Sequence, residues 1–213
     1  MKNKVLNVIK NNKHLVLSFI CLAIFIVVLV NVLNGNVEGF DKSIYSAISS
    51  LKSDFITAFF KTITKFADAE TLILIALVGL IVIKNRKIGA SIAVNLLCSG
   101  FVNHLIKELV QRPRPPIELR MVEESSFSFP SGHAMTSATF YGLIIYFILK
   151  NVKNKKLRNT ICITLSLLIF LIGISRIYLG VHYASDVLAG FTFAIVYLVL
   201  YITFVLKLFK IGK

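Results

Sequence analysis

Charged side chains are scarce in this sequence, and their scarcity excludes most soluble proteins. Of the 213 residues only 16% are charged, whereas 56% are hydrophobic and the mean hydropathy is +0.80. A soluble globular domain carries about 25% charged residues. The composition therefore predicts an integral membrane protein.

Cysteine is also rare, and no cluster of metal-binding side chains is evident. The three cysteines, Cys21, Cys98 and Cys162, fall in three separate apolar stretches. Their odd number and wide spacing indicate neither a disulfide framework nor a zinc site. The acidic residues form no cluster suited to a metal ion either. We therefore expect no cofactor and no bound metal.

Long stretches without Lys, Arg, Asp or Glu are abundant by contrast. Five of them cover residues 15–37, 88–106, 134–149, 159–175 and 187–206. Because about 20 helical residues cross the hydrocarbon core of a membrane, these stretches are candidate transmembrane helices. A sixth stretch, residues 71–83, has only 13 residues and also fits a buried or re-entrant segment.

The distribution of basic residues decides how we interpret the short stretch. Five Lys and Arg residues lie between 150 and 158. Four more, in the N-terminal tail, are Lys2, Lys4, Lys10 and Lys13. Such groups mark cytoplasmic segments. Both segments are cytoplasmic only if residues 71–83 also cross the membrane, so we expect an all-α bundle of six transmembrane helices with both termini in the cytoplasm.

The excess of 24 basic over 10 acidic residues could also indicate a nucleic-acid-binding protein. In the predicted topology, however, 15 of the basic residues lie in short cytoplasmic segments, and every acidic residue lies outside or at the outer boundary. This pattern is typical of membrane orientation. We therefore expect a multi-pass protein of the plasma membrane with no nucleic-acid partner, and we infer no obligate protein partner.

The basic N-terminal segment and the apolar stretch after it resemble a secretory signal. The apolar run is too long for one, and no A-x-A cleavage site follows it. We interpret it as a retained first helix. No internal repeat, low-complexity tract or linker divides the chain, so we expect one membrane domain over residues 1–213.

Apolar residues between the first two stretches recur every three or four positions. They are Phe40, Ile44, Ile48, Leu51, Phe55, Phe59, Ile63 and Phe66. This period predicts an extracytoplasmic amphipathic helical segment over residues 40–66, broken near Ser53. It either packs across the outer end of the bundle or serves as an interfacial helix that guides lipid entry.

Three groups of polar residues lie at the ends of apolar stretches, where such residues are costly. Residues 107–115 read Lys-Glu-Leu-Val-Gln-Arg-Pro-Arg-Pro, residues 130–133 read Pro-Ser-Gly-His at a predicted helix start, and residues 175–186 contain Ser-Arg, a His and an Asp. The predicted topology puts all three on the outer side. Their cations and helix N–H groups suit a phosphate. The predicted ligands are Lys107, Arg114, Ser131, Gly132 and Arg176.

His182 and Asp186 are four residues apart, a spacing that would place them on one face of a helix. A carboxylate bonded to one ring nitrogen makes the other nitrogen a better nucleophile. We expect His182 to attack phosphorus and form a phosphohistidine, with His133 as the acid that protonates the departing oxygen. Taken singly, each of these residues could equally be an anchor at a helix end.

Taken together, the motifs Lys-x6-Arg-Pro, Pro-Ser-Gly-His and Ser-Arg-x5-His-x3-Asp resemble those of the type 2 phosphatidic acid phosphatase superfamily, which includes the vanadium haloperoxidases. The matching core covers residues 107–186. The resemblance implies His182 as nucleophile, His133 as general acid and Asp186 as the residue that orients His182. It also implies that the phosphoryl oxygens are held by Lys107, Arg114, Ser131, Gly132 and Arg176.

Two details of the first motif and the loop after it stay open. Arg112 could compete with Arg114 for the phosphate, although the spacing favours Arg114. The loop residues without a family counterpart are Glu118, Arg120, Glu123 and Glu124. We expect them to be solvated and to contribute at most to the choice of head group.

The resemblance implies metal-independent hydrolysis of the terminal phosphate of a lipid phosphate or diphosphate on the outer face of the membrane. Among the membrane-bound members of the superfamily, this compact six-span chain resembles bacterial phosphatidylglycerophosphate phosphatases and undecaprenyl pyrophosphate phosphatases. Phosphatidylglycerophosphate, undecaprenyl pyrophosphate and phosphatidic acid are therefore the candidate substrates. The predicted transmembrane helices argue against vanadate-dependent halide oxidation, because the enzymes that catalyse that reaction are soluble. A non-enzymatic lipid-binding or transport protein is the remaining alternative, although binding alone needs no paired His and Asp.

Overall fold

The computed structural model describes residues 12–208 and 211, which form helices, turns and loops with no strand among them. Lys2, Lys4 and Lys10 of the predicted cytoplasmic tail lie outside the described residues. The main helices are α2 (Lys13–Leu33), α3 (Glu38–Ser49), α4 (Asp54–Thr64), α5 (Ala69–Val82), α6 (Arg86–Val110), α7 (Gly132–Asn151), α8 (Lys155–Tyr178) and α9 (Ala184–Leu200). The short elements are η1 (Lys65–Ala67), η2 (Ile117–Leu119), the π-helical turn η3 (Tyr201–Val205) and α10 (Leu206–Leu208).

Within the described part of the chain, five helices are long and apolar enough to cross a membrane. They are α2, α6, α7, α8 and α9 with its continuation to Val205. They contain the five long uncharged stretches almost completely, so the all-α architecture and the multi-pass membrane protein are confirmed. Helix α5 has 14 residues, which by length alone does not establish a crossing.

Helix α7 lies at the centre of the bundle, packed against α6, α8 and α9. Its side chains Phe140 and Leu143 join Ile172 of α8 in the main apolar core. In the most apolar 18-residue stretch of α7, half of the residues are buried. The corresponding share for α2, which packs mainly against α9, is 17%. The outer apolar side chains of α2 are thus left for contact with lipid.

Helix α9 approaches the start of α7 closely because of Gly190. A Cβ atom at this position would lie 2.9 Å from the carbonyl oxygen of Ser131, the N-cap residue of α7. The N–H of Ser131 donates to the carbonyl oxygen of Asp186, in the first turn of α9, at 3.0 Å. The helix starts that carry the second and third motifs are therefore held side by side.

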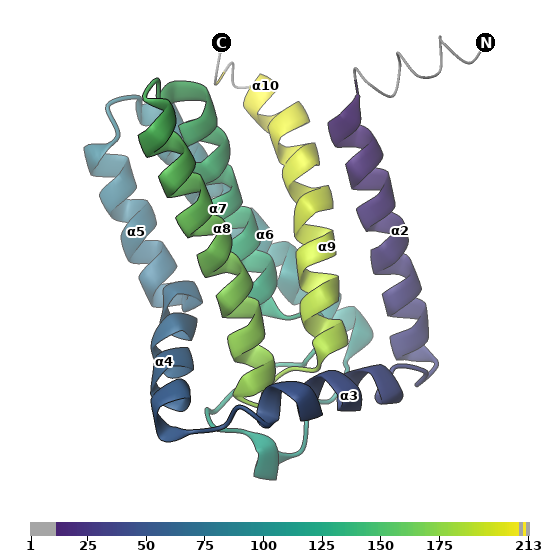
Figure 1. Ribbon diagram of the computed structural model, residues 1–213. Coiled ribbons are helices and arrows are strands. Elements are labelled where there is room, and N and C mark those ends of the chain that lie inside the picture. The colour runs from purple at the N-terminus through teal and green to yellow at the C-terminus, as the bar shows by residue number, and fades with distance from the viewer. Residues whose placement is uncertain (1–11, 209–210, 212–213) are drawn as a thin grey trace, which may run out of the picture.

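Helix α3 lies across one end of the bundle, and α4 stands at that end in line with α5 (Figure 1). The start of α2 and the α5–α6 and α7–α8 turns lie at the opposite end (Figure 1). The break between α3 and α4 falls at Ser53, whose Oγ caps α4 by accepting the N–H of Ile56 at 3.3 Å. The three motifs gather at the α3 end, and the basic segment 150–158 lies at the other end.

Candidate active site

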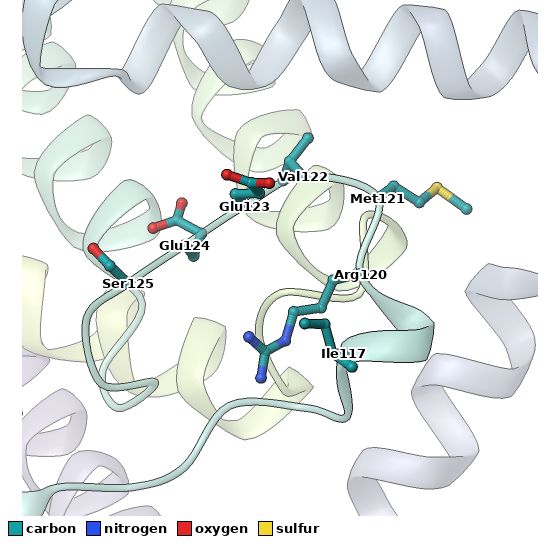
Figure 2. A pocket seen from close by; sticks show the side chains of 7 residues that line it. All are labelled: Ile117, Arg120, Met121, Val122, Glu123, Glu124 and Ser125. Atoms are coloured by element: carbon teal, nitrogen blue, oxygen red, sulfur yellow. The ribbon is translucent and has the colours of Figure 1, made fainter.

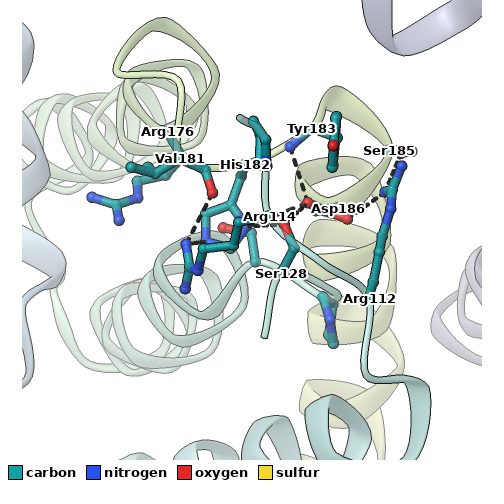
Figure 3. Close-up of polar contacts among 12 residues, drawn as sticks. Arg112, Arg114, Ser128, Arg176, Val181, His182, Tyr183, Ser185 and Asp186 are labelled. Carbon is teal, nitrogen blue, oxygen red and sulfur yellow. Dashed lines mark hydrogen bonds and ion pairs between the residues drawn. The ribbon is translucent and has the colours of Figure 1, made fainter. Parts of the chain in front are cut away.

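Two loops at the α3 end of the bundle carry most of the site, the α6–α7 loop (residues 111–131) and the α8–α9 loop (residues 179–183). They are bonded to each other, because the N–H of Met121 donates to the carbonyl oxygen of Leu179 at 2.9 Å. Gly180 has a φ of +70°, and a Cβ there would overlap the carbonyl oxygen of Leu119. Glycine is therefore required at this turn. Figure 3 shows the side chains that converge beside the two loops.

His182 lies in the α8–α9 loop with only 2% of its side chain exposed. Its Nδ1 is 3.4 Å from Oδ2 of Asp186, and its Nε2 is 3.2 Å from Nη1 of Arg114 (Figure 3). Burial lowers the pKa of His182 to about 3, because the loss of hydration outweighs the attraction of Asp186. The imidazole is neutral at physiological pH, and the lone pair of its Nε2 faces the Arg114 guanidinium.

The carboxylate of Asp186 is fully buried and is held by three further donors. Its Oδ2 accepts the hydroxyl of Ser128 at 2.5 Å and the N–H of Tyr183 at 2.9 Å. Its Oδ1 is bonded to the guanidinium of Arg112. These contacts leave the carboxylate little freedom to rotate, so the orientation of the His182 ring is also fixed.

The prediction that His182 and Asp186 share a helix face is wrong, although the two side chains do meet. Helix α9 begins at Ala184, so His182 precedes the helix. Asp186 is the third residue of α9, and its carboxylate folds back over the helix N-terminus in a capping box with Tyr183. The contact with His182 follows from this cap.

Arg112 links α3 to the start of α9. Its Nη2 donates to Oδ2 of Asp41 at 2.7 Å, and its Nη1 donates to Asp186 and to the hydroxyl of Ser185 at 2.8 Å. The guanidinium also stacks on the ring of Tyr183, 4.1 Å from its centroid. Asp41 is only 4% exposed. Two carboxylates thus neutralise Arg112, whereas Nε2 of His182 contacts the other arginine of this motif, Arg114.

Arg114, the other arginine of the doubled Arg-Pro, lies beside His182 and a second carboxylate. Its Nη2 is 3.3 Å from Oε2 of Glu124, and the other oxygen of Glu124 is bonded to Nη2 of Arg176. The Glu124 side chain is 23% exposed, so the expectation that it is solvated is wrong. Glu124 bridges two cations of the predicted phosphate site.

A cavity of about 740 Å³ opens next to Glu124 in the α6–α7 loop. Figure 2 shows the carboxylates of Glu123 and Glu124 and the guanidinium of Arg120 around it. Arg120 is held there because its Nε donates to the carbonyl oxygen of Pro115 at 2.7 Å. An opening of this size, joined to Arg114 and Arg176 through Glu124, could admit a head group.

The remaining predicted cations are buried at helix ends. Arg176, in the last turn of α8, is 2% exposed and donates from Nη1 to Oγ1 of Thr64 at 2.7 Å. Its Nε has no partner within the described residues. Lys107, in the last turn of α6, is 6% exposed and bonds through Nζ to the carbonyl oxygen of Phe127. Buried cations of this kind favour a bound anion.

The start of α7 differs in one detail from the sequence prediction. The N–H of Ser131 is not free, because it donates to the backbone of Asp186, and the Ser131 hydroxyl accepts the N–H of Ala134 at 3.4 Å. Gly132 and His133 come next, and helix geometry gives their N–H groups no acceptor within α7. Donors for an anion therefore begin at Gly132, with the Ser131 hydroxyl beside them.

His133, the second residue of α7, meets a carboxylate that the sequence does not indicate. Its Nε2 is 3.0 Å from Oδ1 of Asp68, which lies directly before α5. The hydrogen bond with His133 holds the pKa of Asp68 below its ordinary value. His133 and His182 therefore have separate carboxylate partners.

Metal-binding residues are not grouped in the described part of the chain, where no three His, Cys, Asp or Glu side chains could hold an ion together. Cys21, Cys98 and Cys162 are free thiols on α2, α6 and α8. The titratable groups of the site are arranged as two His–Asp pairs and a set of cations.

Three residues of the site escape detection from the sequence. They are Asp41, Asp68 and Ser128. The two aspartates have partners 71 and 65 residues away in the chain, so no local spacing marks them. Ser128 lies two residues before the Pro-Ser-Gly-His motif, and this proximity is the only sequence signal for it.

Comparisons with known proteins identify the family. The model of the PAP2 superfamily matches residues 88–210. The chain is 33% identical over 181 residues to phosphatidylglycerophosphatase B of Bacillus subtilis, covering 81% of this chain and 87% of that protein. It is 26% identical over 191 residues to the undecaprenyl-diphosphatase of Sulfolobus acidocaldarius, covering 83% and 82%.

A solved structure agrees with these matches. The crystal structure of the transmembrane PAP2 type phosphatidylglycerolphosphate phosphatase from Bacillus subtilis superimposes with a TM-score of 0.80 at 28% identity, over 89% of this chain and 96% of that one. The shared fold extends beyond the three motifs to nearly the whole bundle. By its family match, its relative at 33% identity and its fold, this chain belongs to the PAP2 superfamily of phosphatases.

Proposed function

We propose that the chain removes the terminal phosphate from a membrane lipid phosphate or diphosphate through a phosphohistidine on His182. The observation that carries this proposal is the placement of His182, with Nε2 3.2 Å from Arg114 and Nδ1 facing the buried Asp186. A neutral imidazole held by a carboxylate on one side and facing a cation on the other is arranged to attack an anionic phosphoryl group. Lipid binding without catalysis would need no such pair.

The first step forms the covalent intermediate. Nε2 of His182 attacks phosphorus, and the bond between phosphorus and the lipid oxygen breaks. His133 gives its proton to that oxygen, so the lipid leaves as an alcohol, or as a lipid monophosphate when the substrate is a diphosphate. The Nδ1–H of His182 stays bonded to Asp186, which stabilises the positive charge that develops on the ring.

The second step regenerates the enzyme. His133, now neutral, accepts a proton from a water molecule as the water oxygen attacks phosphorus. The bond between phosphorus and His182 breaks, and inorganic phosphate leaves. Both histidines return to their starting protonation states, so one water is consumed for each phosphate released.

The phosphoryl oxygens bind, in this proposal, to cations and donors from three helix ends. Glu124 already bonds two of the cations, so the substrate must displace its carboxylate from Arg114 and Arg176. A phosphate dianion carries more charge and more acceptor oxygens than a carboxylate, which favours this exchange. The proposed ligands are Lys107, Arg114, Arg176, the hydroxyl of Ser131 and the N–H of Gly132.

The names of the relatives support the substrate class. One is named a phosphatidylglycerophosphatase and the other an undecaprenyl-diphosphatase. These substrates share a terminal phosphoryl group on a membrane lipid, which is the part that the described cations would bind. Phosphatidylglycerophosphate, undecaprenyl pyrophosphate and phosphatidic acid are our candidates. The 740 Å³ cavity beside Glu124 would hold the rest of the head group.

We also propose six crossings of the plasma membrane, with α5 as the sixth span, cytoplasmic termini and an extracytoplasmic site in one domain of residues 1–213. The support is that the basic segment 150–158 lies at the end of the bundle opposite the site (Figure 1). Because Asp41 ties α3 to the site, we favour packing across the outer end as the role of this helix.

Cysteine labelling tests the orientation. In a cysteine-free background, Glu123→Cys should react with an impermeant thiol reagent in intact cells, and Asn154→Cys should not. The reverse pattern would place hydrolysis on the cytoplasmic leaflet.

Purified protein in detergent, assayed against the three candidate lipids, tests the activity. We expect release of inorganic phosphate from at least one of them, insensitive to EDTA and blocked by vanadate, which mimics the transition state of phosphoryl transfer. Loss of turnover on chelation, restored by Mg²⁺, would contradict the mechanism.

A further inference from the structure

We propose that Asp68 is a positioning residue for the general acid His133, fixing which ring nitrogen delivers the proton to the leaving oxygen. This inference rests on the proposed function, because it takes His133 as the acid. Asp68 lies outside all three sequence motifs, in the segment between η1 and α5.

The first observation is that Asp68 occupies the N-cap position of α5 without capping it. Aspartate at an N-cap normally accepts an N–H from its own helix, which stabilises the helix by about 0.5–2 kcal/mol. None of the described N–H groups of α5 bonds to the Asp68 side chain. Its Oδ1 lies instead 3.0 Å from Nε2 of His133. The carboxylate therefore serves the histidine rather than the helix.

The second observation is that the chain directly before Asp68 is anchored at two points. Thr64, at the end of α4, accepts Nη1 of Arg176 on α8 at 2.7 Å. The carbonyl oxygen of Phe66 in η1 accepts the hydroxyl of Tyr141 on α7 at 2.7 Å. These bonds tie the short segment to the two helices that carry the second and third motifs. Asp68 is thereby held opposite His133.

The contacts around His133 give Asp68 a chemical role. Asp68 is the carboxylate bonded to the His133 ring, 3.0 Å from Nε2, whereas Glu124 in the α6–α7 loop is bonded to Arg114 and Arg176. In the proposed mechanism the substrate displaces Glu124 from its arginines, so Asp68 remains the fixed partner. A carboxylate bonded to Nε2–H leaves Nδ1 as the nitrogen that gives and takes the proton.

Leaving-group dependence tests this role. A missing acid matters for a lipid alkoxide but little for p-nitrophenolate, which departs without a proton. We expect Asp68→Asn to lower kcat/KM about 10- to 100-fold on the lipid phosphate and less than about 3-fold on p-nitrophenyl phosphate. Glu70→Gln, which removes an exposed carboxylate from the first turn of the same helix, is the matched control and should change neither.

The double variant Asp68→Asn/His133→Ala separates positioning from a general effect on the fold. If Asp68 acts through His133, this variant should have the same kcat/KM as His133→Ala alone on both substrates. A further loss in the double variant, or equal losses on the two substrates for Asp68→Asn, would overturn the inference. The single variant His133→Ala tests the proposed function separately. If it loses equally on the lipid phosphate and on p-nitrophenyl phosphate, the assignment of His133 as the acid is wrong, whatever Asp68 does.

Discussion

The two His–Asp pairs of the site lie in different surroundings. His182 and Asp186 have side chains 2% and 0% exposed, whereas His133 and Asp68 are 18% and 45% exposed. Burial keeps the first imidazole neutral and fixed, as a nucleophile requires. The second pair is open enough to exchange a proton with a leaving group or with water. In the proposed mechanism, the environment of each His–Asp pair, more than its residue types, sets the step that the pair serves.

The largest effect should come from removing the enclosed histidine. We expect His182→Ala to lower kcat/KM by about 10⁴-fold or more on every substrate, because no other group can take over as nucleophile. Asp186→Asn should weaken lipid and aryl phosphates alike, since it acts through His182. Appreciable turnover of p-nitrophenyl phosphate by purified His182→Ala would show that the nucleophile is wrongly assigned.

The open histidine should show a selective loss. A general acid contributes about 10²–10⁴-fold when the leaving oxygen is a poor one. His133→Ala should therefore lose this factor in kcat/KM on phosphatidylglycerophosphate and much less on p-nitrophenyl phosphate. The ratio of the two kcat/KM values is the measurement. Equal losses on both substrates would mean that His133 is not the general acid.

A smaller effect should follow from weakening the carboxylate that bridges the cations. Glu124→Gln removes a negative charge from Arg114 and Arg176, and a partly exposed ion pair is worth about 1 kcal/mol or less. We expect vanadate to inhibit this variant at a concentration about 2- to 5-fold lower. Glu123→Gln, at the exposed neighbouring position, is the control and should be unchanged. Unchanged or weaker inhibition of Glu124→Gln would exclude competition by Glu124.

Protonation of the enclosed His182 should have almost no effect on the pH dependence of kcat/KM. With its pKa lowered to about 3, His182 stays unprotonated, and therefore competent, down to about pH 4. In the His133→Ala background, kcat/KM for p-nitrophenyl phosphate, corrected for ionisation of the substrate, should be flat from pH 7 to pH 5. A histidine with an ordinary pKa of about 6.5 would lose about 25-fold over this range. Such a loss would contradict the burial of His182 away from water as the cause of its low pKa.

The sequence predicts the five long apolar helices well because they depend on local signals. Uncharged stretches indicate the long helices, and the motif spacing alone singles out Arg114, His133 and His182. The break at Ser53 is also local, because serine caps the helix that follows it. These features require only residues near each other in the chain.

The parts that the sequence does not predict depend on long-range packing. Asp41 and Asp68 are single carboxylates whose partners lie on other helices, so only the assembled bundle shows their contacts. The role of Glu124 depends on how the α6–α7 loop folds back over two arginines. The prediction for His182 and Asp186 had the right contact and the wrong reason, since a helix cap rather than a helix face brings them together.

Trapping the intermediate tests the central claim most directly. Enzyme mixed with a substrate labelled in its terminal phosphate, quenched in alkali within the first turnover and digested, should carry label on the peptide that contains His182. That label should be stable in alkali, labile in acid and absent from His182→Ala. Label on another residue, or release of the lipid product in the first turnover with no labelled protein, would contradict a phosphohistidine at His182.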